Sequence, residues 1–296
     1  MTIREVESVS PTEFYDVSSQ LPRFIARRSE EALAAGDAAR DAISSLEELR
    51  ARQELMRREF VACLGGLPPS DTPLHARTVE TIRCDGFSIE KVIFASRPGV
   101  FVTANLYLPD GITSPRGAVL FLCGHHYEAK QNPEYQTVCQ YLVRAGLVVL
   151  AQDPVGQGER LSYYEPSLGG TTVDWGTTEH EYAGIQCLPL GDAIGRYFVH
   201  DAMRGVDYLC SRPEVDPARI GVTGNSGGGT QTSMLMVCDP RLAAAAPATF
   251  IMDRRAWLYQ GGAQDAEQIW PGTTALGFDH EDILLALAPK PVLVLA

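Results

Sequence analysis

Three short runs of almost uninterrupted apolar residues constrain this chain more than any other feature. They are "AVLFLCG" at 118–124, "LVVLAQD" at 147–153 and "RIGVTGN" at 219–225, and helix-like segments separate them. A strand without a polar side must be covered on both faces, which is typical of parallel sheets packed between helices. The alternation therefore predicts an α/β fold with a doubly wound, mostly parallel sheet.

The first part of the chain has a different character. Residues 28–64 are rich in Ala, Glu, Leu and Arg with apolar positions at helical spacing, so they predict helix, with Gly36 as the candidate break. The stretch "GGLPPSDTP" then ends the helical pattern and predicts a linker. We therefore expect an N-terminal helical extension over residues 1–70 and an α/β domain over residues 71–296.

Two further patterns lie within the α/β part. The extended runs "ARTVETIRC" and "FSIEKVIFAS" are separated by Asp85-Gly86, a pair that favours a β-hairpin. Residues 161–191 and 252–278 show no clear period and carry many polar and aromatic residues. A loop of the length of residues 161–191 in a compact domain is usually a lid or substrate-binding insertion, and we expect that there.

The overall charge excludes some kinds of partner. The 296 residues carry a formal net charge of −12, whereas nucleic-acid binding needs a basic surface. No apolar run reaches the roughly 20 residues that cross a bilayer, and the opening residues lack a signal-peptide pattern. We therefore expect a cytoplasmic protein that binds neither nucleic acid nor membranes, and the sequence leaves its oligomeric state open.

Seven cysteines are spread along the chain, an odd number without a C-x-x-C pair. This pattern is typical of free thiols in a reducing compartment. We therefore expect no disulfide framework and no cysteine zinc site. Neither a metal nor another cofactor is predicted.

A glycine-rich turn, "GNSGG" at 224–228, follows the third apolar run. A Walker loop would need a lysine that is absent, and a dinucleotide fingerprint would need a third glycine where Thr232 stands. The pattern G-x-S-x-G between a buried strand and a helix instead predicts a nucleophile elbow. A plain glycine turn that happens to contain a serine is the alternative.

The chemistry of such an elbow explains its spacing. The nucleophile stands on a strained strand-to-helix turn, and small residues two positions before and after it let strand and helix approach. The next backbone N–H and the helix N-terminus face the oxyanion of the reaction. We therefore predict Ser226 as the nucleophile and the Gly227 N–H as an oxyanion-hole donor.

The order of these motifs resembles the α/β-hydrolase superfamily. The hairpin, "VLFLCGHH", "LVVLAQDPVGQGER", "GVTGNSGGGTQT" and "PKPVLVLA" follow one another between about residue 75 and residue 296. More narrowly, the chain is similar to bacterial esterases known as acetylxylan esterase-like, near the prolyl-oligopeptidase-type hydrolases. The elbow and the "D-x-x-G-x-G-E-R" loop carry this resemblance, and neither points to a particular substrate.

The resemblance implies further roles. The second oxyanion donor comes from the loop "CGHH", so we expect it to be the backbone N–H of His125. A side chain of His125 or His126 would pack under the site, and metal binding is not expected because no acidic partner lies at helical spacing. Asp153 is expected to tie down a loop in which Gly156 and Gly158 take positive φ.

A serine nucleophile also needs a general base and an orienting acid. The resemblance implies the chain order Ser, acid, His, and only His280 of the six histidines follows Ser226. We therefore expect acid and base beyond Ala296, and an exposed apolar edge on this chain. The weaker alternative is His280 with Asp279 or Asp282, although a helix start capped by Asp279 explains these residues without catalysis.

These features favour a serine ester hydrolase that forms an acyl-enzyme with a small-molecule ester. The resemblance implies small acyl esters, including those of carbohydrates. The alternatives are a non-catalytic hydrolase scaffold and a prolyl-oligopeptidase-type peptidase. Because the base is expected elsewhere, we expect these 296 residues alone to hydrolyse p-nitrophenyl acetate no faster than background.

For two groups of residues near the expected site, the sequence allows two interpretations. Asp265 and Glu267 either line the pocket mouth or, as the better account, lie in a solvated loop. Trp175, Trp257 and Trp270 either shape a sugar-binding subsite or pack in the core or lid.

Overall fold

The computed structural model describes residues 19–260 and 264–296, and its centre is a seven-stranded sheet in the order β1-β2-β3-β5-β4-β8-β9. Its strands are β1 (Arg77–Arg83), β2 (Phe87–Arg97), β3 (Val100–Pro109), β4 (Arg116–Leu122), β5 (Val148–Gln152), β8 (Val215–Asn225) and β9 (Ala244–Ala248). The pairs β5–β4, β4–β8 and β8–β9 are parallel, whereas β1 to β3 and the β3–β5 pair are antiparallel. The α/β class and the Asp85-Gly86 hairpin are thus confirmed.

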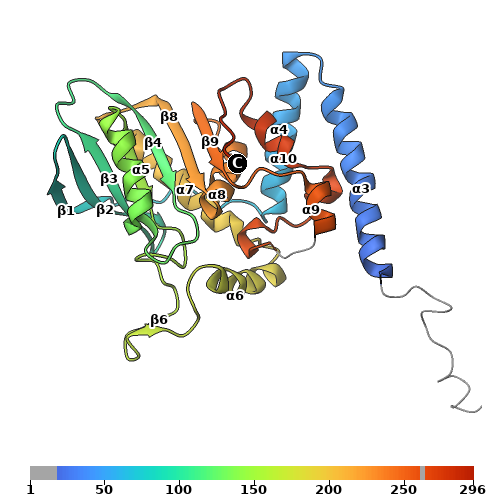
Figure 1. The fold of residues 1–296 in the computed structure, drawn as a ribbon, viewed down its shortest axis with the longest axis horizontal. Helices are drawn as coiled ribbons and strands as arrows, with labels where there is room; N and C mark the ends of the chain where they lie inside the picture. Colours follow the sequence, from blue (N-terminus) through green and yellow to red (C-terminus); the bar gives the residue numbers. More distant parts are fainter. Residues whose placement is uncertain (1–18, 261–263) are drawn as a thin grey trace, which may run out of the picture.

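Helices cover both faces of the sheet (Figure 1). They are α3 (Gln20–Asp41), α4 (Leu46–Cys63), α5 (Pro133–Arg144), α6 (Thr177–Cys187), α7 (Gly195–Ser211), α8 (Gly227–Cys238), α9 (Arg254–Gln260) and α10 (His280–Leu287). One face packs against α5 around Tyr107 and Val143, and the other packs against α4, α7, α8 and α10. Every residue of α8 is buried, because neighbouring helices enclose it on the side away from the sheet.

Beyond β9, the chain continues the sheet without forming a regular strand. Single parallel bridges join Ala245 to Val292 and Ala248 to Leu295. The side chains of Leu293, Val294 and Leu295 are exposed. The segment "KPVLVLA", in which a strand was expected, thus pairs with β9 only through isolated bridges.

The N-terminal helices differ in one respect from the prediction. Gly36 does not break the helix; the break lies at residues 42–45, where Ser45 caps α4 by accepting a hydrogen bond from the Glu48 N–H at 3.2 Å. A Cβ on Gly36 would lie 2.0 Å from the carbonyl oxygen of Gly277, so this glycine provides close packing rather than a bend. Residues 1–18 of the predicted extension lie outside the described residues.

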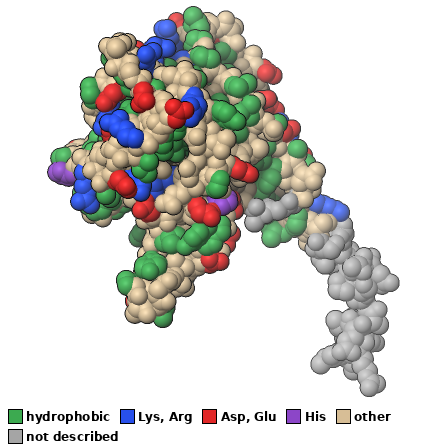
Figure 2. All heavy atoms as spheres, turned by 60° about the vertical axis from the view of Figure 1, so that its left-hand side comes forward, with side chains coloured by type: hydrophobic (Ala, Val, Ile, Leu, Met, Phe, Trp, Pro, Cys, Tyr) green, Lys and Arg blue, Asp and Glu red, His purple; other side chains and the backbone are tan. Residues whose placement is uncertain are grey.

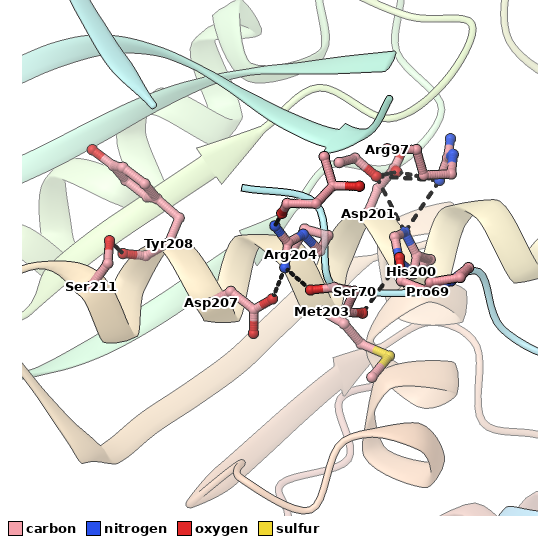
Figure 3. A network of polar contacts seen from close by, with 12 residues as sticks. Pro69, Ser70, Arg97, His200, Asp201, Met203, Arg204, Asp207, Tyr208 and Ser211 are labelled. Atoms are coloured by element: carbon pink, nitrogen blue, oxygen red, sulfur yellow. Dashed lines mark hydrogen bonds and ion pairs between the residues drawn. The ribbon is translucent and has the colours of Figure 1, made fainter. Parts of the chain in front are cut away.

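The predicted linker is fixed to α7 by buried polar side chains (Figure 3). The guanidinium of Arg204 donates hydrogen bonds to the carbonyl oxygens of Ser70 and Thr72. On the same helix, Asp201 is ion-paired with Arg97 and with Arg160. This network joins the linker, the end of β2 and the loop after β5 to one helix.

The two insertions contain more structure than the sequence indicated. Residues 161–191 form the short pair β6 (Tyr164–Glu165) and β7 (Gly170–Thr171), then helix α6 and the 3₁₀ turn η2 (Leu188–Leu190). Residues 252–278 contain α9 and the 3₁₀ turns η3 (Ala266–Gln268) and η4 (Thr274–Leu276). The β6–β7 segment projects from the body of the molecule (Figure 1).

The cysteines, the helices and the surface charges each test what the sequence composition predicts. All seven cysteines are free thiols, as predicted. Among the described helices, none combines the length and apolar character needed to cross a membrane. On the face drawn in Figure 2, Lys and Arg side chains are interspersed with Asp and Glu.

Candidate active site

The turn between β8 and α8 places Ser226 at the carboxyl edge of the parallel strands. Its φ is +57° and its ψ is −118°, a strained combination for a residue with a side chain. The backbone N–H of Ser226 donates to the Ala248 carbonyl oxygen at 3.0 Å and to Oγ1 of Thr249 at 2.8 Å. These bonds to the neighbouring strand end hold the strained residue in place, and Ser226 is exposed.

The glycines on either side of Ser226 are required by close backbone approach. A Cβ on Gly224 would lie 2.4 Å from the carbonyl oxygen of Leu122, and a Cβ on Gly228 would lie 2.0 Å from the same oxygen. Strand β4 therefore approaches both arms of the turn more closely than any side chain would permit. The spacing G-x-S-x-G has the physical basis that the sequence analysis proposed for an elbow.

The predicted oxyanion-hole donors lie on two segments beside Ser226. Gly227 is the first residue of α8, so its N–H has no acceptor within the helix. The buried side chain of Gln157 donates to the carbonyl oxygens of Gly124 and His126, at 2.7 and 2.8 Å. Because both flanking carbonyls are bound, the backbone of His125 is held in one orientation. Its role as the second donor stays a prediction.

The loop after β5 has the structural role that we predicted. The carboxylate of Asp153 is fully buried and accepts hydrogen bonds from Oγ1 of Thr103 at 2.6 Å and from the backbone N–H of Glu159 at 3.2 Å. Gly156 and Gly158 have φ values of +76° and +59°. This loop carries Gln157 and so supports the position of His125.

A buried cluster that the sequence analysis did not find lies next to the elbow. The ring of His125 packs against Gly227, where a Cβ would lie 2.7 Å from Cε1 of the imidazole. Nε2 of His125 lies 2.9 Å from Oε1 of Glu267, and Nδ1 of His180 lies 3.1 Å from Oε2 of the same carboxylate. Nδ1 of His125 lies 3.6 Å from Oδ2 of Asp265. One carboxylate thus joins two histidines from distant segments.

The charges in this cluster shift one another's pKa. Burial opposes the charge on Glu267, but its contacts with His125 and His180 outweigh burial and lower the pKa of Glu267 to about 2. Burial likewise opposes the charge on His125, yet the contact with Glu267 and the charge of Asp265 raise the pKa of His125. Burial and the nearby charge of Glu267 raise the pKa of Asp265. Glu267 is therefore ionised at neutral pH.

The solvated-loop interpretation of Glu267 is wrong. This residue is 1% exposed, although Asp265, two positions earlier, is partly exposed. Its partner His180 is fully buried in α6, a helix that was predicted as an irregular loop. A lone Glu and a lone His in two aperiodic segments carry no sequence signal of contact.

The structure gives His280 and Asp282 packing and capping contacts. Asp279 caps α10, as predicted, and the structure adds a capping box between Asp279 and Asp282. Asp282 accepts hydrogen bonds from Arg40 at 2.6 Å and from Arg52 at 2.7 Å. Nδ1 of His280 accepts from the Met252 N–H at 3.2 Å. Within residues 19–260 and 264–296, no hydrogen bond joins either side chain to the elbow serine, and their catalytic role stays an untested alternative.

His280 makes stability depend on pH. Burial and then the charge of Arg254 lower the pKa of His280 from 6.5 to about 4. Since the folded-state pKa is depressed, the unfolded chain takes up the proton first, and stability is lost as pH falls from 6.5 towards 4. Urea unfolding should show a loss of about 3 kcal/mol between pH 7 and pH 4 from this group.

The matched variant is His280→Asn, which keeps a hydrogen-bond acceptor for the Met252 N–H but does not titrate. It will be less stable at every pH because it lacks the ring between Phe250 and Trp270. The stability difference between wild type and variant should shrink by about 3 kcal/mol from pH 7 to pH 4. An unchanged difference would contradict a neutral buried His280.

The three tryptophans have different surroundings. Trp270 is 5% exposed and packs edge-on against Phe60, so it belongs to the core. Trp257 lines a hollow of about 700 Å³ between α3 and the second insertion, and Ser226 is not among the lining residues. Trp175 packs against Tyr127 at 5.5 Å between ring centres. The core interpretation thus holds for Trp270.

Comparisons with known proteins agree with this geometry. Residues 191–271 match the model of the prolyl oligopeptidase family, a stretch that contains the elbow. An uncharacterized protein of Pseudomonas aeruginosa, PA2218, is 28% identical over 159 residues, which are 54% of this chain and 36% of that protein. The chain therefore spans about a third of the length of this curated relative.

Solved structures of similar fold include several esterases. A protein from Bacteroides fragilis assigned as an acetyl xylan esterase has a TM-score of 0.71 and 21% identity, covering 85% of this chain and 69% of that one. The methylesterase BT1017 has a TM-score of 0.70 and 22% identity, covering 90% and 54%. A CE15 glucuronoyl esterase from Teredinibacter turnerae has a TM-score of 0.57 and 19% identity, covering 86% and 68%. The chain therefore has the α/β-hydrolase fold that its sequence predicts, and it is similar to acetyl xylan esterase-like proteins of that fold.

Proposed function

We propose that this protein is a serine ester hydrolase with Ser226 as its nucleophile. The observation that carries the proposal is the conformation of Ser226: exposed, at a φ of +57°, between a buried strand and a buried helix. Strain of this kind at an exposed serine is typical of a functional site rather than of a plain glycine turn. No cofactor is needed for this chemistry, which forms and hydrolyses an acyl-enzyme.

The oxyanion would be stabilised by two backbone donors. The Gly227 N–H lies at the N-terminus of α8, whose dipole adds positive potential. The His125 N–H belongs to a loop fixed by Gln157 on one side of the turn and by Gln231, which donates to the Cys123 carbonyl oxygen at 3.0 Å. Donors held in place before the reaction stabilise developing charge most effectively.

The substrate class rests on the comparisons. Proteins of this fold with TM-scores of 0.71 and 0.70 carry the names acetyl xylan esterase and methylesterase. We propose small acyl esters, including esters of carbohydrates, as substrates. The general base and its acid stay the prediction made from the resemblance, since the described contacts bring neither to Ser226.

A covalent probe tests the nucleophile directly. The natural full-length protein should react with a fluorophosphonate, and the adduct should map by mass spectrometry to the tryptic peptide from Ile220 to Arg241. Fragmentation should place it on Ser226 rather than on Ser233, which is fully buried in α8. An adduct elsewhere, or none, would favour the non-catalytic scaffold.

A peptidase of the prolyl-oligopeptidase type is the second candidate, because residues 191–271 match that family's model. The same serine would then attack an amide rather than an ester. Comparing a p-nitrophenyl ester with a proline p-nitroanilide separates the two candidates. Faster turnover of the anilide would replace the esterase proposal.

A further inference from the structure

Three side chains behind the elbow form a group suited to a metal ion. One ring nitrogen of His125, one of His180 and one carboxylate oxygen of Glu267 lie within 4.8 Å of one another. They come from three segments: the loop after β4, helix α6 and the turn η3. Two imidazoles and one carboxylate are the donor set of many sites for zinc and related divalent ions.

The second nitrogen of each ring also faces an acceptor. Nε2 of His180 lies 2.8 Å from the carbonyl oxygen of Val155. Nδ1 of His125 lies 3.6 Å from Oδ2 of Asp265. Histidines that bind a metal usually donate their other N–H to a backbone carbonyl or a carboxylate, which fixes the tautomer. A proton on Nε2 of His180, donated to Val155, leaves Nδ1 of that ring free to bind a metal. Asp265 lies beyond hydrogen-bond distance of His125, and its charge favours a proton on the ring nitrogen that faces it.

Glu267 supplies an independent observation. Its side chain is 1% exposed, and its Oε1 has no hydrogen-bond partner among the described residues. The contact of this oxygen with Nε2 of His125 is short, 2.9 Å, but does not have hydrogen-bond geometry. A buried carboxylate oxygen without a partner is costly unless a charge satisfies it. A cation between the two rings would do so.

We propose that His125, His180 and Glu267 bind one divalent transition-metal ion of the zinc class. Neighbouring ligand atoms in a tetrahedral zinc site are about 3.3 Å apart, given bonds of roughly 2.0–2.1 Å. The two N–O distances, 2.9 and 3.1 Å, run to different oxygens of the carboxylate, and the three ligand atoms lie within 4.8 Å of one another. Side-chain shifts that bring the two rings closer together would complete the site. Three protein ligands leave a fourth position for water or another ligand.

The proposal revises the expectation of no metal. That expectation considered acidic partners near the adjacent histidines in sequence, whereas Glu267 comes from the second insertion. The ion would join this insertion and α6 to the loop that carries the predicted oxyanion donor. It would thus fix the surroundings of Ser226 without being part of the acyl transfer.

Zinc binding can be measured without any assay of activity. The natural full-length protein, freed of metal with a chelator, should bind one Zn²⁺ per chain in isothermal titration calorimetry. Glu267→Gln should weaken binding by about 100-fold, and Asp265→Asn by about 10-fold because it acts through His125. His126→Asn is the control, since His126 contacts Glu128 instead of the cluster, and it should leave affinity unchanged.

Two further readouts keep the test decisive. Because the chain has seven free thiols, Co²⁺ is used as a spectroscopic substitute, and its spectrum should lack a thiolate charge-transfer band. If Glu267→Gln fails to fold, the partly exposed Asp265→Asn still carries the test. Absence of stoichiometric binding, a thiolate band, or wild-type affinity in both variants would overturn the proposal and leave a buried ion-paired network.

Discussion

Ser226→Ala is expected to abolish reaction with a fluorophosphonate and to lower kcat/KM for a small acyl ester by about 10⁴-fold or more in the natural full-length protein. The magnitude follows from the loss of the only atom that can form the acyl-enzyme. Stability should change little, because Ser226 is exposed and its side chain makes no capping hydrogen bond. Alanine also keeps the backbone N–H that bonds to the end of β9.

The matched control is Ser167→Ala, a change at an exposed serine next to the β6–β7 pair. Labelling and turnover should stay at the wild-type level in this variant. Residual turnover of Ser226→Ala within tenfold of wild type would show that another group attacks the ester. Loss of activity in both variants would point to a defect in the preparation.

The tight strand-to-helix turn at Ser226 could be predicted because its requirements are local. Gly224, Ser226 and Gly228 lie within five consecutive residues, and their spacing follows from one strand, one turn and one helix. The apolar strands β4, β5 and β8 were predictable for a similar reason, since burial on both faces leaves a continuous apolar run. Asp153 and its glycines belong to the same class, because the loop they form spans only a few residues.

The histidine–glutamate cluster could not be predicted, because its members meet only through the tertiary fold. His180 and Glu267 are 87 positions apart, and each lies in a segment without a clear period. Helix α6 itself was missed because its three buried residues are Glu179, His180 and Gly184 rather than an apolar stripe. Hydrophobic periodicity cannot detect a helix that buries polar side chains.

The turn at Ser226 and the histidine–glutamate cluster are formed by different parts of the chain. The elbow is determined by the sheet and α8, whereas the residues that surround it come from the two insertions. Gln157 and Gln231 fix the His125 loop from the sheet side, and Glu267 contacts its ring from the other side. Changes in the insertions can therefore alter the surroundings of Ser226 while the turn itself stays the same. Such changes would allow proteins of one fold to act on different esters.

The turn around Ser226 is expected to tolerate far less change, and a pair of substitutions on strand β8 tests this. Gly224→Ala should lower the free energy of unfolding by about 3 kcal/mol, because its Cβ would lie 2.4 Å from the Leu122 carbonyl oxygen and 2.6 Å from that of Gly228. Both obstructing atoms belong to the backbone, so β4 or α8 would have to move. Fluorophosphonate labelling of Ser226 should fall in parallel, since the turn would be displaced.

Gly221→Ala is the matched control on the same strand β8. There the added Cβ would meet its nearest atom, the carbonyl oxygen of Ala244, at 3.5 Å, which is ordinary contact. Stability should change by less than about 1 kcal/mol, because alanine also restricts the unfolded chain. Urea unfolding of both variants measures the difference. Equal stability of the two would mean that β4 and α8 can separate without cost, and close approach would no longer explain the glycine two positions before Ser226.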